Sequence, residues 1–509
     1  MGSGLAHAAA VNEILSRAAD LFRAQDLAGC LLLCRSVLAD DPADIGALHL
    51  TGVSRVRGGD AKDGADLLSR TLTAWPGELL LRMDCALGYA GLGEIDRAVT
   101  ILAEGARYHP GNPDLAARLA RLLSDNGRHQ DSQAVLRAAL ATRPDHLELR
   151  GLLAAELAAD LAFTPALAQM RLMQAMLPEQ SPLYANEGVL RQSQGDLHGA
   201  IAAYRRAVAI DPDNHVAQVN FGTALMSQGD YAAGWTRYEH RLHLRDMRLP
   251  PAGIPRWNGE RLEGKRLLVS AEQGFGDLFQ FIRFLPLLQE FGGEIWLDCP
   301  VEARRLLAAL PGLSGIVCPG DRLPGMDYAI PLLSLPWLLQ TGSRLMSESI
   351  PYIYRVESGP VLPADPRRKI GLVWSGRPAK GELFIRRTLA RRSTTLSDLE
   401  PLWRLDQFAW YSLQLGEEPA GTNLLDLAPL ISDFADSAAL IDQLDLVISI
   451  DTAVAHLTAA MGKPLFLLLA PEQCDYRWAN NSPWYPNVRT FQGPFKKMAT
   501  EVASLLISS

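Results

Sequence analysis

Hydrophobic and polar positions follow two different patterns, which divide the chain near residue 246. Beyond that point, short apolar runs alternate with amphipathic segments of helical period. The runs have the length and composition of buried strands, and strands separated by helices predict parallel sheets with crossover helices. We expect strands at residues 266–270, 295–299, 370–374, 408–413, 446–450 and 465–469. The part of the chain beyond residue 246 is long enough for two small Rossmann-like halves, and we expect the boundary between them near residues 361–368.

The first part of the chain has residues that recur at a step of 34. One series consists of prolines, which lack an N–H group and so end a helix. A second series has Gly or Ala, where a larger side chain would keep two packed helices apart, and a third has glycines that can end a helix at positive φ. The pattern predicts repeats of helix, glycine turn, helix and proline. The series are Pro42, Pro76, Pro110, Pro144, Pro178 and Pro212; Gly52, Ala86, Ala120, Ala154, Gly188 and Gly222; and Gly59, Gly93, Gly127, Gly195 and Gly229, which Leu161 interrupts.

This unit resembles the tetratricopeptide repeat, most clearly at residues 195–204, followed by Ala207 and residues 212–214. The resemblance covers residues 10–245, and the period disfavours the alternative of an unrelated helical bundle. Stacked hairpins of this kind form a superhelical solenoid with a concave face, which usually holds an extended peptide or another protein. We therefore expect a protein or peptide partner in the groove of the repeats.

Composition narrows the class of protein further. At 509 residues the chain is too long for one core, and its formal net charge of −8 disfavours a nucleic-acid partner. Its six cysteines show no C-x-x-C pairing and no metal-ligand spacing with histidine, which is typical of reduced thiols. The N-terminus lacks the features of a signal peptide, and no apolar run reaches the roughly 18 residues of a membrane span. We expect a cytoplasmic protein whose contacts with membranes, if any, are peripheral.

In parallel α/β sheets ligands collect at the carboxyl ends of strands. The first candidate segment is therefore residues 270–277, which holds Glu272, Gln273, Gly274, Gly276 and Asp277. Its glycines let the backbone turn tightly, and Asp277 lies in the first turn of a helix that we expect to begin near residue 278. The alternative is that Asp277 only caps this helix.

The second candidate segment is residues 444–457, where a strand runs directly into a helix through Asp451 and Thr452. Small residues, Ala453 and Ala455, leave the first-turn N–H groups open, and the helix dipole favours an anion such as a diphosphate there. The alternatives are that Asp451 or Thr452 caps the helix and that His456 is a buried core histidine. For His456 taken alone, the sequence favours the core interpretation.

The third candidate segment follows the strand at residues 370–374 and begins with Trp374, Ser375 and Gly376. Residues 397–400 form a capping box, so we expect the next helix to begin at Ser397. The basic stretch between them is a loop whose arginines can neutralise phosphate charge, although solvated surface side chains are the commoner case. Only Arg392 is therefore nominated for the site. The stretch holds Lys380, Arg386, Arg387, Arg391 and Arg392.

Taken in this order, the segments resemble glycosyltransferase family 9, whose best-known members are the lipopolysaccharide heptosyltransferases. The match is closest to bacterial proteins that join tetratricopeptide repeats to a compact transferase of this type. The resemblance spans residues 250–495, and its motifs lie at residues 255–259, 272–277, 280–283, 371–376, 433–436, 451–456 and 482–486. It implies a GT-B arrangement, in which the first Rossmann-like half binds an acceptor and the second binds a nucleotide-activated sugar. The expected domains are the repeats at 1–245, a linker at 246–264, and halves at 265–360 and 361–509.

The resemblance also implies roles for single residues. Asp277 corresponds to the general base that acts on the acceptor hydroxyl, and Asp451 to a residue that holds sugar hydroxyls. Gln414 borders the base or ribose of the donor, and the loop after residue 374 and the helix after Thr452 lie near the diphosphate. The residues expected at the donor are Trp374, Ser375, Gly376, Arg392, Gln414, Asp451, Thr452, Ala453 and His456; those of the acceptor-side loop are Glu272, Gln273, Gly274 and Gly276.

The sequence departs from the family pattern in two places. Its first half is short for a complete acceptor domain, so we expect the repeats to complete that side of the cleft. The segment before Arg392 and Ser393 is expanded by residues 381–391, which leaves the role of this pair open. No D-x-D triplet occurs in residues 246–509, so we expect a reaction that requires no metal and no other cofactor. One in-line displacement, with Asp277 as the base, would invert the anomeric centre.

The sequence leaves several chemical classes of acceptor open. A peptide-binding array beside a transferase favours a protein acceptor, for which flagellin is a candidate. The alternatives are a saccharide or lipid-linked saccharide acceptor, or a repeat scaffold that has lost transferase activity. The sequence does not specify the donor sugar, its nucleotide or the oligomeric state.

Overall fold

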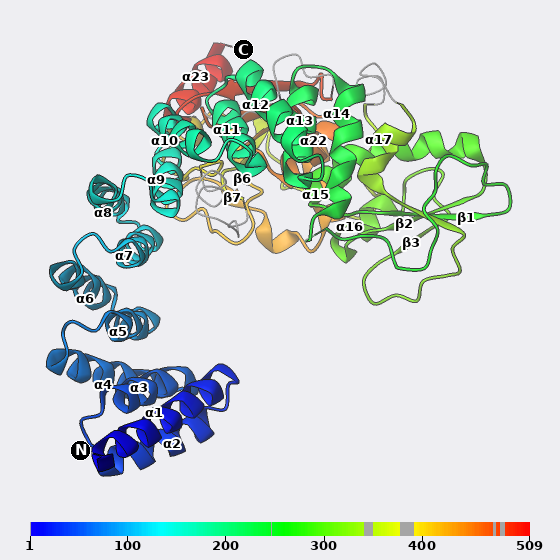
Figure 1. The fold of residues 1–509 in the computed structure, drawn as a ribbon. Coiled ribbons are helices and arrows are strands. Elements are labelled where there is room, and N and C mark those ends of the chain that lie inside the picture. Colours follow the sequence, from blue (N-terminus) through cyan, green and yellow to red (C-terminus); the bar gives the residue numbers. More distant parts are fainter. Residues whose placement is uncertain are drawn as a thin grey trace. The chain divides into compact units, whose positions relative to one another are not determined.

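The computed structural model describes residues 2–245, 247–340, 350–376, 391–471, 475–478 and 484–508, with side chains from residue 7 onward. Contacts divide the chain into two compact units, Met1–Ala175 and Met176–Ser509. The division falls inside the predicted repeat array. The last two helical hairpins therefore belong to the same unit as the α/β region (Figure 1).

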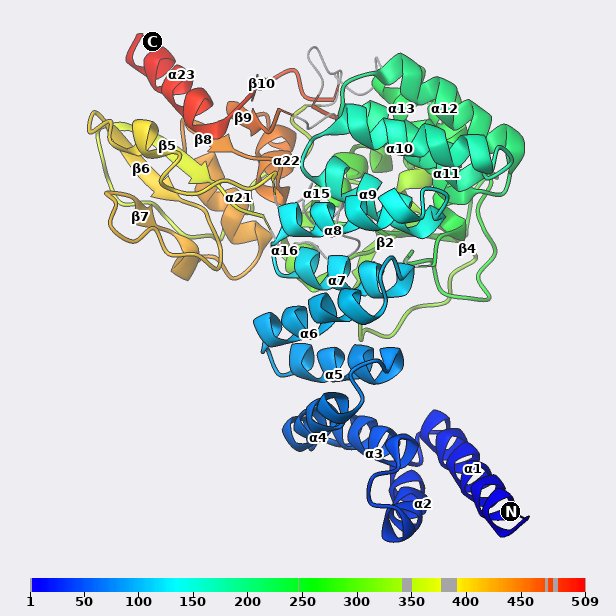
Figure 2. The same cartoon turned by 60° about the vertical axis from the view of Figure 1, so that its left-hand side comes forward.

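The first unit consists of helical hairpins that follow one another along the chain (Figure 2). Each second helix that precedes a proline of the 34-residue series ends two residues before it, as expected for a residue that cannot continue the hydrogen-bond ladder. The helices are α1 (Gly2–Arg23), α2 (Leu27–Asp40), α3 (Ile45–Gly58), α4 (Ala61–Ala74), α5 (Leu79–Gly91), α6 (Ile95–Tyr108), α7 (Pro113–Asp125), α8 (His129–Thr142), α9 (Leu147–Ala159) and α10 (Phe163–Met176).

The turn inside each hairpin has a residue in the left-handed region. Gly59 has φ 103°, and the other glycines of its series also have positive φ, which confirms the prediction. Leu161 and Gln25 stand at the same step and adopt φ 61° and 64°. The turn geometry is therefore kept even where the sequence does not supply glycine.

The series of small residues lies where paired helices meet, as predicted. A Cβ atom on Gly222 would lie 2.7 Å from the carbonyl oxygen of Gly234 in the partner helix. On Gly188 it would overlap the ring of Tyr204. Ala86, Ala120 and Ala154 take the equivalent places in other hairpins and are buried there.

The second unit begins with two hairpins and a 3-10 turn, and continues as two parallel sheets. The hairpins are α11 (Ser181–Ser193), α12 (Leu197–Ile210), α13 (His215–Ser227) and α14 (Tyr231–Tyr238), followed by η1 (Glu239–His243). The first sheet has the order β3-β2-β1-β4 and the second β10-β9-β8-β5-β6-β7. The strands are β1 (Arg266–Ser270), β2 (Glu294–Asp298), β3 (Gly315–Val317), β4 (Tyr328–Pro331), β5 (Arg368–Val373), β6 (Phe408–Ser412), β7 (Leu425–Asp426), β8 (Leu446–Ser449), β9 (Leu465–Leu469) and β10 (Val488–Gln492).

Every strand predicted from an apolar run is present, whereas β3, β4, β7 and β10 were not predicted. The remaining helical elements are α15 (Phe275–Phe281), η2 (Ile282–Phe291), α16 (Val301–Leu307), η3 (Leu332–Ser334), α17 (Leu335–Leu338), α20 (Glu400–Trp403), η4 (Ala428–Leu430), α21 (Phe434–Asp442), α22 (Ala453–Ala460) and α23 (Phe495–Ser508). The expected helix start at Ser397 is wrong, because α20 begins at Glu400. Asp398 instead accepts hydrogen bonds from the hydroxyls of Thr394 and Thr395, and residues 396–399 form turns.

The strand orders place the candidate segments at topological switch points. In each sheet the chain runs outward from a central strand and then returns to its other side, so the order reverses between β1 and β4 and between β5 and β8. Ligands of doubly wound sheets bind in the crevice at the carboxyl ends of such strands. The segments after β1, β5 and β8 are the three that the sequence nominated. The structure thus has the predicted class, a helical solenoid followed by a GT-B-like pair of parallel α/β halves.

The last hairpin packs into the core of the α/β region. The ring of Trp235 on α14 meets Phe281 and Trp484 edge to face, with centroids 5.7 and 6.2 Å apart. Met226 and Tyr238 belong to the same buried cluster. The last hairpin therefore packs against the first half through Phe281 and against the second half through Trp484. The expectation that the repeats complete the acceptor side of a cleft stays a prediction.

Two arginines join the α/β halves to each other. Arg305 on α16 binds Asp433, the N-cap of α21, with Nε and Nη2 at 2.9 and 2.7 Å from its two oxygens. Arg283 on η2 donates to the carbonyl of Trp484 and to the hydroxyl of Tyr352, at 2.9 and 2.7 Å. The family motifs at 280–283 and 433–436 therefore serve contacts between the halves. Within the described ranges, no helix has the length and apolar character needed to cross a membrane.

Candidate active site

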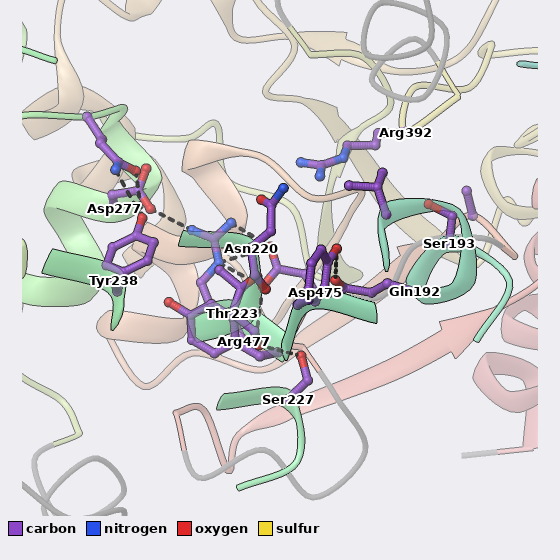
Figure 3. Close-up of a pocket in the computed structure, with 15 residues that line it drawn as sticks. Gln192, Ser193, Asn220, Thr223, Ser227, Tyr238, Asp277, Arg392, Asp475 and Arg477 are labelled. Carbon is purple, nitrogen blue, oxygen red and sulfur yellow. Dashed lines mark hydrogen bonds and ion pairs between the residues drawn. The ribbon is translucent and has the colours of Figure 1, made fainter. Parts of the chain in front are cut away.

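A cavity of about 350 Å³ lies in the second unit, between the last repeats and the α/β region (Figure 3). Its repeat side is mostly polar and comes mainly from the first helices of two successive repeats, with one tyrosine from each second helix. Val189 and Thr223, and likewise Ser193 and Ser227, are 34 residues apart and so occupy equivalent positions. Two neighbouring repeats therefore present the same face to the cavity. Gln192, Tyr204, Asn220 and Tyr238 complete this wall.

The opposite wall is built around an ionic chain of three residues. Asp277 is the third residue of α15, and its Oδ1 accepts a hydrogen bond of 2.7 Å from Nη1 of Arg477. Arg477 also forms a bidentate contact with Asp475, in which Nε is 2.9 Å from Oδ1 and Nη2 is 2.6 Å from Oδ2. The side chains of Asp277 and Arg477 keep 21% and 15% of their exposure, so both reach the cavity. Gly274 occupies the N-cap position of α15, which excludes the interpretation of Asp277 as the N-cap.

The electrostatic environment gives the two carboxyl groups of this ionic chain opposite pKa shifts. Burial raises the pKa of Asp277 above its ordinary value, Arg477 opposes that rise, and Asp475 and Asp451 add to it. Burial would also raise the pKa of Asp475, but the bidentate contact with Arg477 outweighs it and lowers this pKa to about 2. Neighbouring carboxyl groups in one cavity thus differ in proton affinity, which is typical of catalytic sites.

The loop after β5 is closed by its own hydrogen bonds. Oε1 of Gln414 accepts from the backbone N–H groups of Trp374 and Ser375, at 3.2 and 2.9 Å, and Gly376 donates to Oγ of Ser393 at 3.0 Å. Trp374 is fully buried. These residues shape the loop, and the cavity lining of the described chain does not include them.

The segment after β8 is also engaged internally. Thr452 is the N-cap of α22, and its side chain accepts a hydrogen bond from the N–H of Ala455. This agrees with the alternative interpretation that Asp451 or Thr452 caps the helix. Asp451 accepts from Nε1 of Trp478 at 2.9 Å and from Nη1 of Arg392 at 3.2 Å. It therefore ties Arg392, which lines the cavity, to the start of α22, where Ala453 is the first helical residue.

His456 lies beneath the site as a buried histidine. Its Nδ1 is 3.0 Å from the hydroxyl of Tyr485, and its ring centroid is 4.4 Å from that of Trp478. Burial lowers the pKa of His456 well below its ordinary value, so the ring is neutral at pH 7. The structure agrees with the core interpretation of this residue.

The sequence-predicted residues therefore separate into groups. Gln273, Asp277 and Arg392 line the cavity. Glu272 does not, because its carboxylate is buried against Arg241, 3.0 Å from Nε. Gly276 faces His456, whose Cδ2 would be 2.7 Å from a Cβ atom at this position. Lys380, Arg386 and Arg387, and the start of the motif at 482–486, lie outside the described residues.

Sequence reasoning missed Asp475, Tyr476 and Arg477, which line the cavity together. They follow β9, so the rule that directs attention to the carboxyl ends of strands could have found them. The repeat residues of the cavity had no comparable signal. Polar side chains on a first helix of a repeat look like solvated surface until the facing domain is known.

Family models match both parts of the chain. Two models of the tetratricopeptide repeat match residues 89–156 and 181–214. The model described as glycosyltransferase family 9 (heptosyltransferase) matches residues 419–503, which run from the loop after β6 to α23. The protein therefore combines tetratricopeptide repeats with a glycosyltransferase family 9 domain.

Relatives of the whole chain and of its parts are also found. Protein FlbA of Caulobacter vibrioides is 26% identical, over 94% of this chain and 86% of its own, so the two have a similar architecture. Cellulose synthase 2 operon protein C of Komagataeibacter xylinus is 33% identical over 26% of this chain and 10% of its own. Among solved structures, MamA from Desulfovibrio magneticus is 21% identical over 32% of this chain and 93% of its own, with a TM-score of 0.29.

Proposed function

We propose that this protein transfers a sugar from a nucleotide-activated donor to an acceptor hydroxyl, with inversion and without a metal or other cofactor. The family 9 match at residues 419–503 and the Rossmann-like order of the second sheet support a nucleotide-sugar donor. The observation that carries the proposal is the position of Asp277. It is a carboxylate with a raised pKa in a cavity large enough for part of a substrate.

Asp277 is the general base of this mechanism. As the acceptor oxygen attacks the anomeric carbon, its proton passes to the Asp277 carboxylate, and the bond from that carbon to the donor phosphate breaks. The electron pair leaves with the nucleotide diphosphate, whose charge Arg392 faces across the cavity. A single displacement of this kind inverts the anomeric centre.

We further propose that the acceptor is a protein, with flagellin as the candidate. The cavity that holds Asp277 is lined on one side by equivalent positions of two successive repeats. Repeats of this class use that face for extended peptides. A peptide in the groove would reach the base without leaving the second unit. We assign the activity to the cytoplasm, where reduced thiols such as Cys299 and Cys318 persist.

Replacing Asp277 by Asn tests the proposal, because it keeps the shape of the side chain and removes its basicity. We expect Asp277→Asn to bind nucleotide sugar as the wild type does and to lose about 10²–10⁴-fold in transfer rate. Nucleotide release with and without acceptor protein measures turnover, and thermal shift measures donor binding. Asp298→Asn is the matched control, since Asp298 ends the neighbouring strand β2 outside the cavity. Full transfer by Asp277→Asn, or a wild type inert toward every nucleotide sugar, would contradict the proposal.

A further inference from the structure

We propose that Arg477 is a positioning residue, which orients Asp277 and keeps it ionised, and that Asp475 anchors Arg477 for this purpose. This inference rests on the proposed function, because it concerns the base of the same reaction. Nothing in the family resemblance assigned a role to either residue.

The guanidinium of Arg477 is fixed in a single orientation. Two of its nitrogens, Nε and Nη2, hold Asp475, while Nη1 reaches Asp277 at 2.7 Å. Because the fork of a guanidinium is rigid and planar, a bidentate contact on one side sets the direction of the remaining N–H groups. Figure 3 shows Arg477 between the two carboxylates. Arg477 thereby engages Oδ1 of Asp277.

Because of the negative charges around Asp277, its carboxylate needs Arg477 in order to stay ionised. Burial, Asp475 and Asp451 all raise the pKa of Asp277, whereas Arg477 and, to a smaller extent, the backbone N–H of Gly274 lower it. Other titratable groups nearby are Tyr238 from the repeats, Tyr476 beside Arg477, and the neutral His456 beneath Gly276. Without Arg477, Asp277 would share its cavity with an uncompensated carboxylate. Such pairs retain a proton at one of the two groups.

A protonated Asp277 cannot act as the base. In the transfer step the proton moves from the acceptor hydroxyl to Asp277, and only the ionised carboxylate has a lone pair to receive it. Arg477 exchanges no proton or bond in this step. It acts through Asp277, by keeping the carboxylate charged before the acceptor arrives.

The pH profile of kcat/KM distinguishes this role from a structural one. Removing the positive charge in Arg477→Met raises the pKa of Asp277, so we expect the acid limb to move to higher pH by about 1–3 pH units. Asp475→Asn removes a negative charge and frees Arg477, so its acid limb is expected to move to lower pH while kcat falls. Opposite movements of the acid limb are not expected from a general loss of packing. Arg404→Met, on a side chain 66% exposed and paired with Glu400, should leave the profile unchanged.

Rescue by a small cation provides the second measurement. Arg477→Lys keeps the charge without the fork, so it should retain the acid limb better than it retains kcat. Arg477→Ala should recover part of its rate when guanidinium is added, well below denaturing concentrations. An unmoved acid limb in Arg477→Met, with only the KM for the donor raised, would overturn the inference and make Arg477 a donor-binding residue. A wild type without turnover would instead refute the proposed function, and that result needs no variant.

Discussion

At the scale of single residues, the site depends on a close approach that only glycine permits. Gly276, one position before the proposed base, lies against the ring of His456, which would be 2.7 Å from an added Cβ. The ring has little freedom to move, because Trp478 packs on its face and Tyr485 binds its Nδ1. The orientation of α15, and so of Asp277, is fixed by this contact.

Gly276→Ala is therefore expected to lower the free energy of unfolding by about 1–3 kcal/mol and to reduce transfer by shifting Asp277. Chemical denaturation measures the first effect and nucleotide release the second. Gly274→Ala is the control for stability, since its Cβ would lie at an ordinary 3.8 Å from Oδ2 of Asp277 at φ −70°. We expect a change within about 0.5 kcal/mol there. If Gly276→Ala and Gly274→Ala were equally stable, the ring of His456 would have to move aside without an energetic cost.

The sequence could identify Asp277 because its position after β1 and in the first turn of a helix is a local property. It could not separate Gln273, which lines the cavity, from Glu272, which is buried against Arg241. Adjacent side chains at a strand end point in different directions, and their partners come from distant segments. Arg477 was missed for the same reason, since its partner Asp277 lies 200 residues away.

At the scale of elements, small residues let the helices of the repeats pack closely. The room for an added methyl group differs from one glycine to another. A methyl group at Gly222 would meet the backbone oxygen of Gly234 and, at 3.0 Å, the backbone nitrogen of Tyr238. Backbone atoms of a packed helix cannot move aside as a flexible side chain can. Gly151 on α9 is different, because the nearest atom to its Cβ is the methyl carbon of Met173 at 3.8 Å.

The same substitution is therefore expected to have opposite effects at these two sites. Gly222→Ala should destabilise the second unit by about 1–3 kcal/mol, because α13 and α14 must separate. Gly151→Ala should stabilise the first unit by about 0.5–1 kcal/mol, because alanine has the higher helix propensity. Thermal unfolding of both variants tests the pair. A gain of stability in both variants would contradict this prediction, because it would mean that α14 moves away from α13 without a loss of packing energy.

Strands were predictable where both faces of the sheet are covered. The residues of β1, β6 and β8 are buried almost throughout, so they appear in the sequence as continuous apolar runs. The short strands β3 and β7 and the edge strand β10 lack such runs. Their position depends on pairing with a neighbour already in place, which local composition does not record.

At the scale of the whole molecule, a buried ionic network holds the end of the repeats against the first sheet. Arg241 on η1 is 1% exposed and contacts Glu272 after β1, Ser334 on η3 and Glu239. Burial raises the pKa of Glu272, and Arg241 counteracts it. The network joins the chain segment before the linker to the loop that leads to Asp277.

Arg241→Met is expected to cost about 3–5 kcal/mol of stability, because it leaves Glu272 buried without its counterion. The loss should be smaller at acidic pH, where Glu272 takes up a proton and no longer needs a cation. Arg256→Met is the matched control, since Arg256 also binds Glu239 but is 38% exposed, and should cost about 0–1 kcal/mol. Denaturant titrations at neutral and acidic pH measure both variants. Equal costs for the two substitutions would contradict the assigned importance of burial.

The division of the chain at Ala175 and Met176 has a practical consequence for recombination between related proteins. A chimaera joined at the end of the helical array would combine a foreign α13 and α14 with a native α15, and would lose the aromatic and ionic contacts between them. A junction beside Pro178 exchanges only the preceding hairpins, and every described residue that lines the cavity remains native, because the lining begins at Val189.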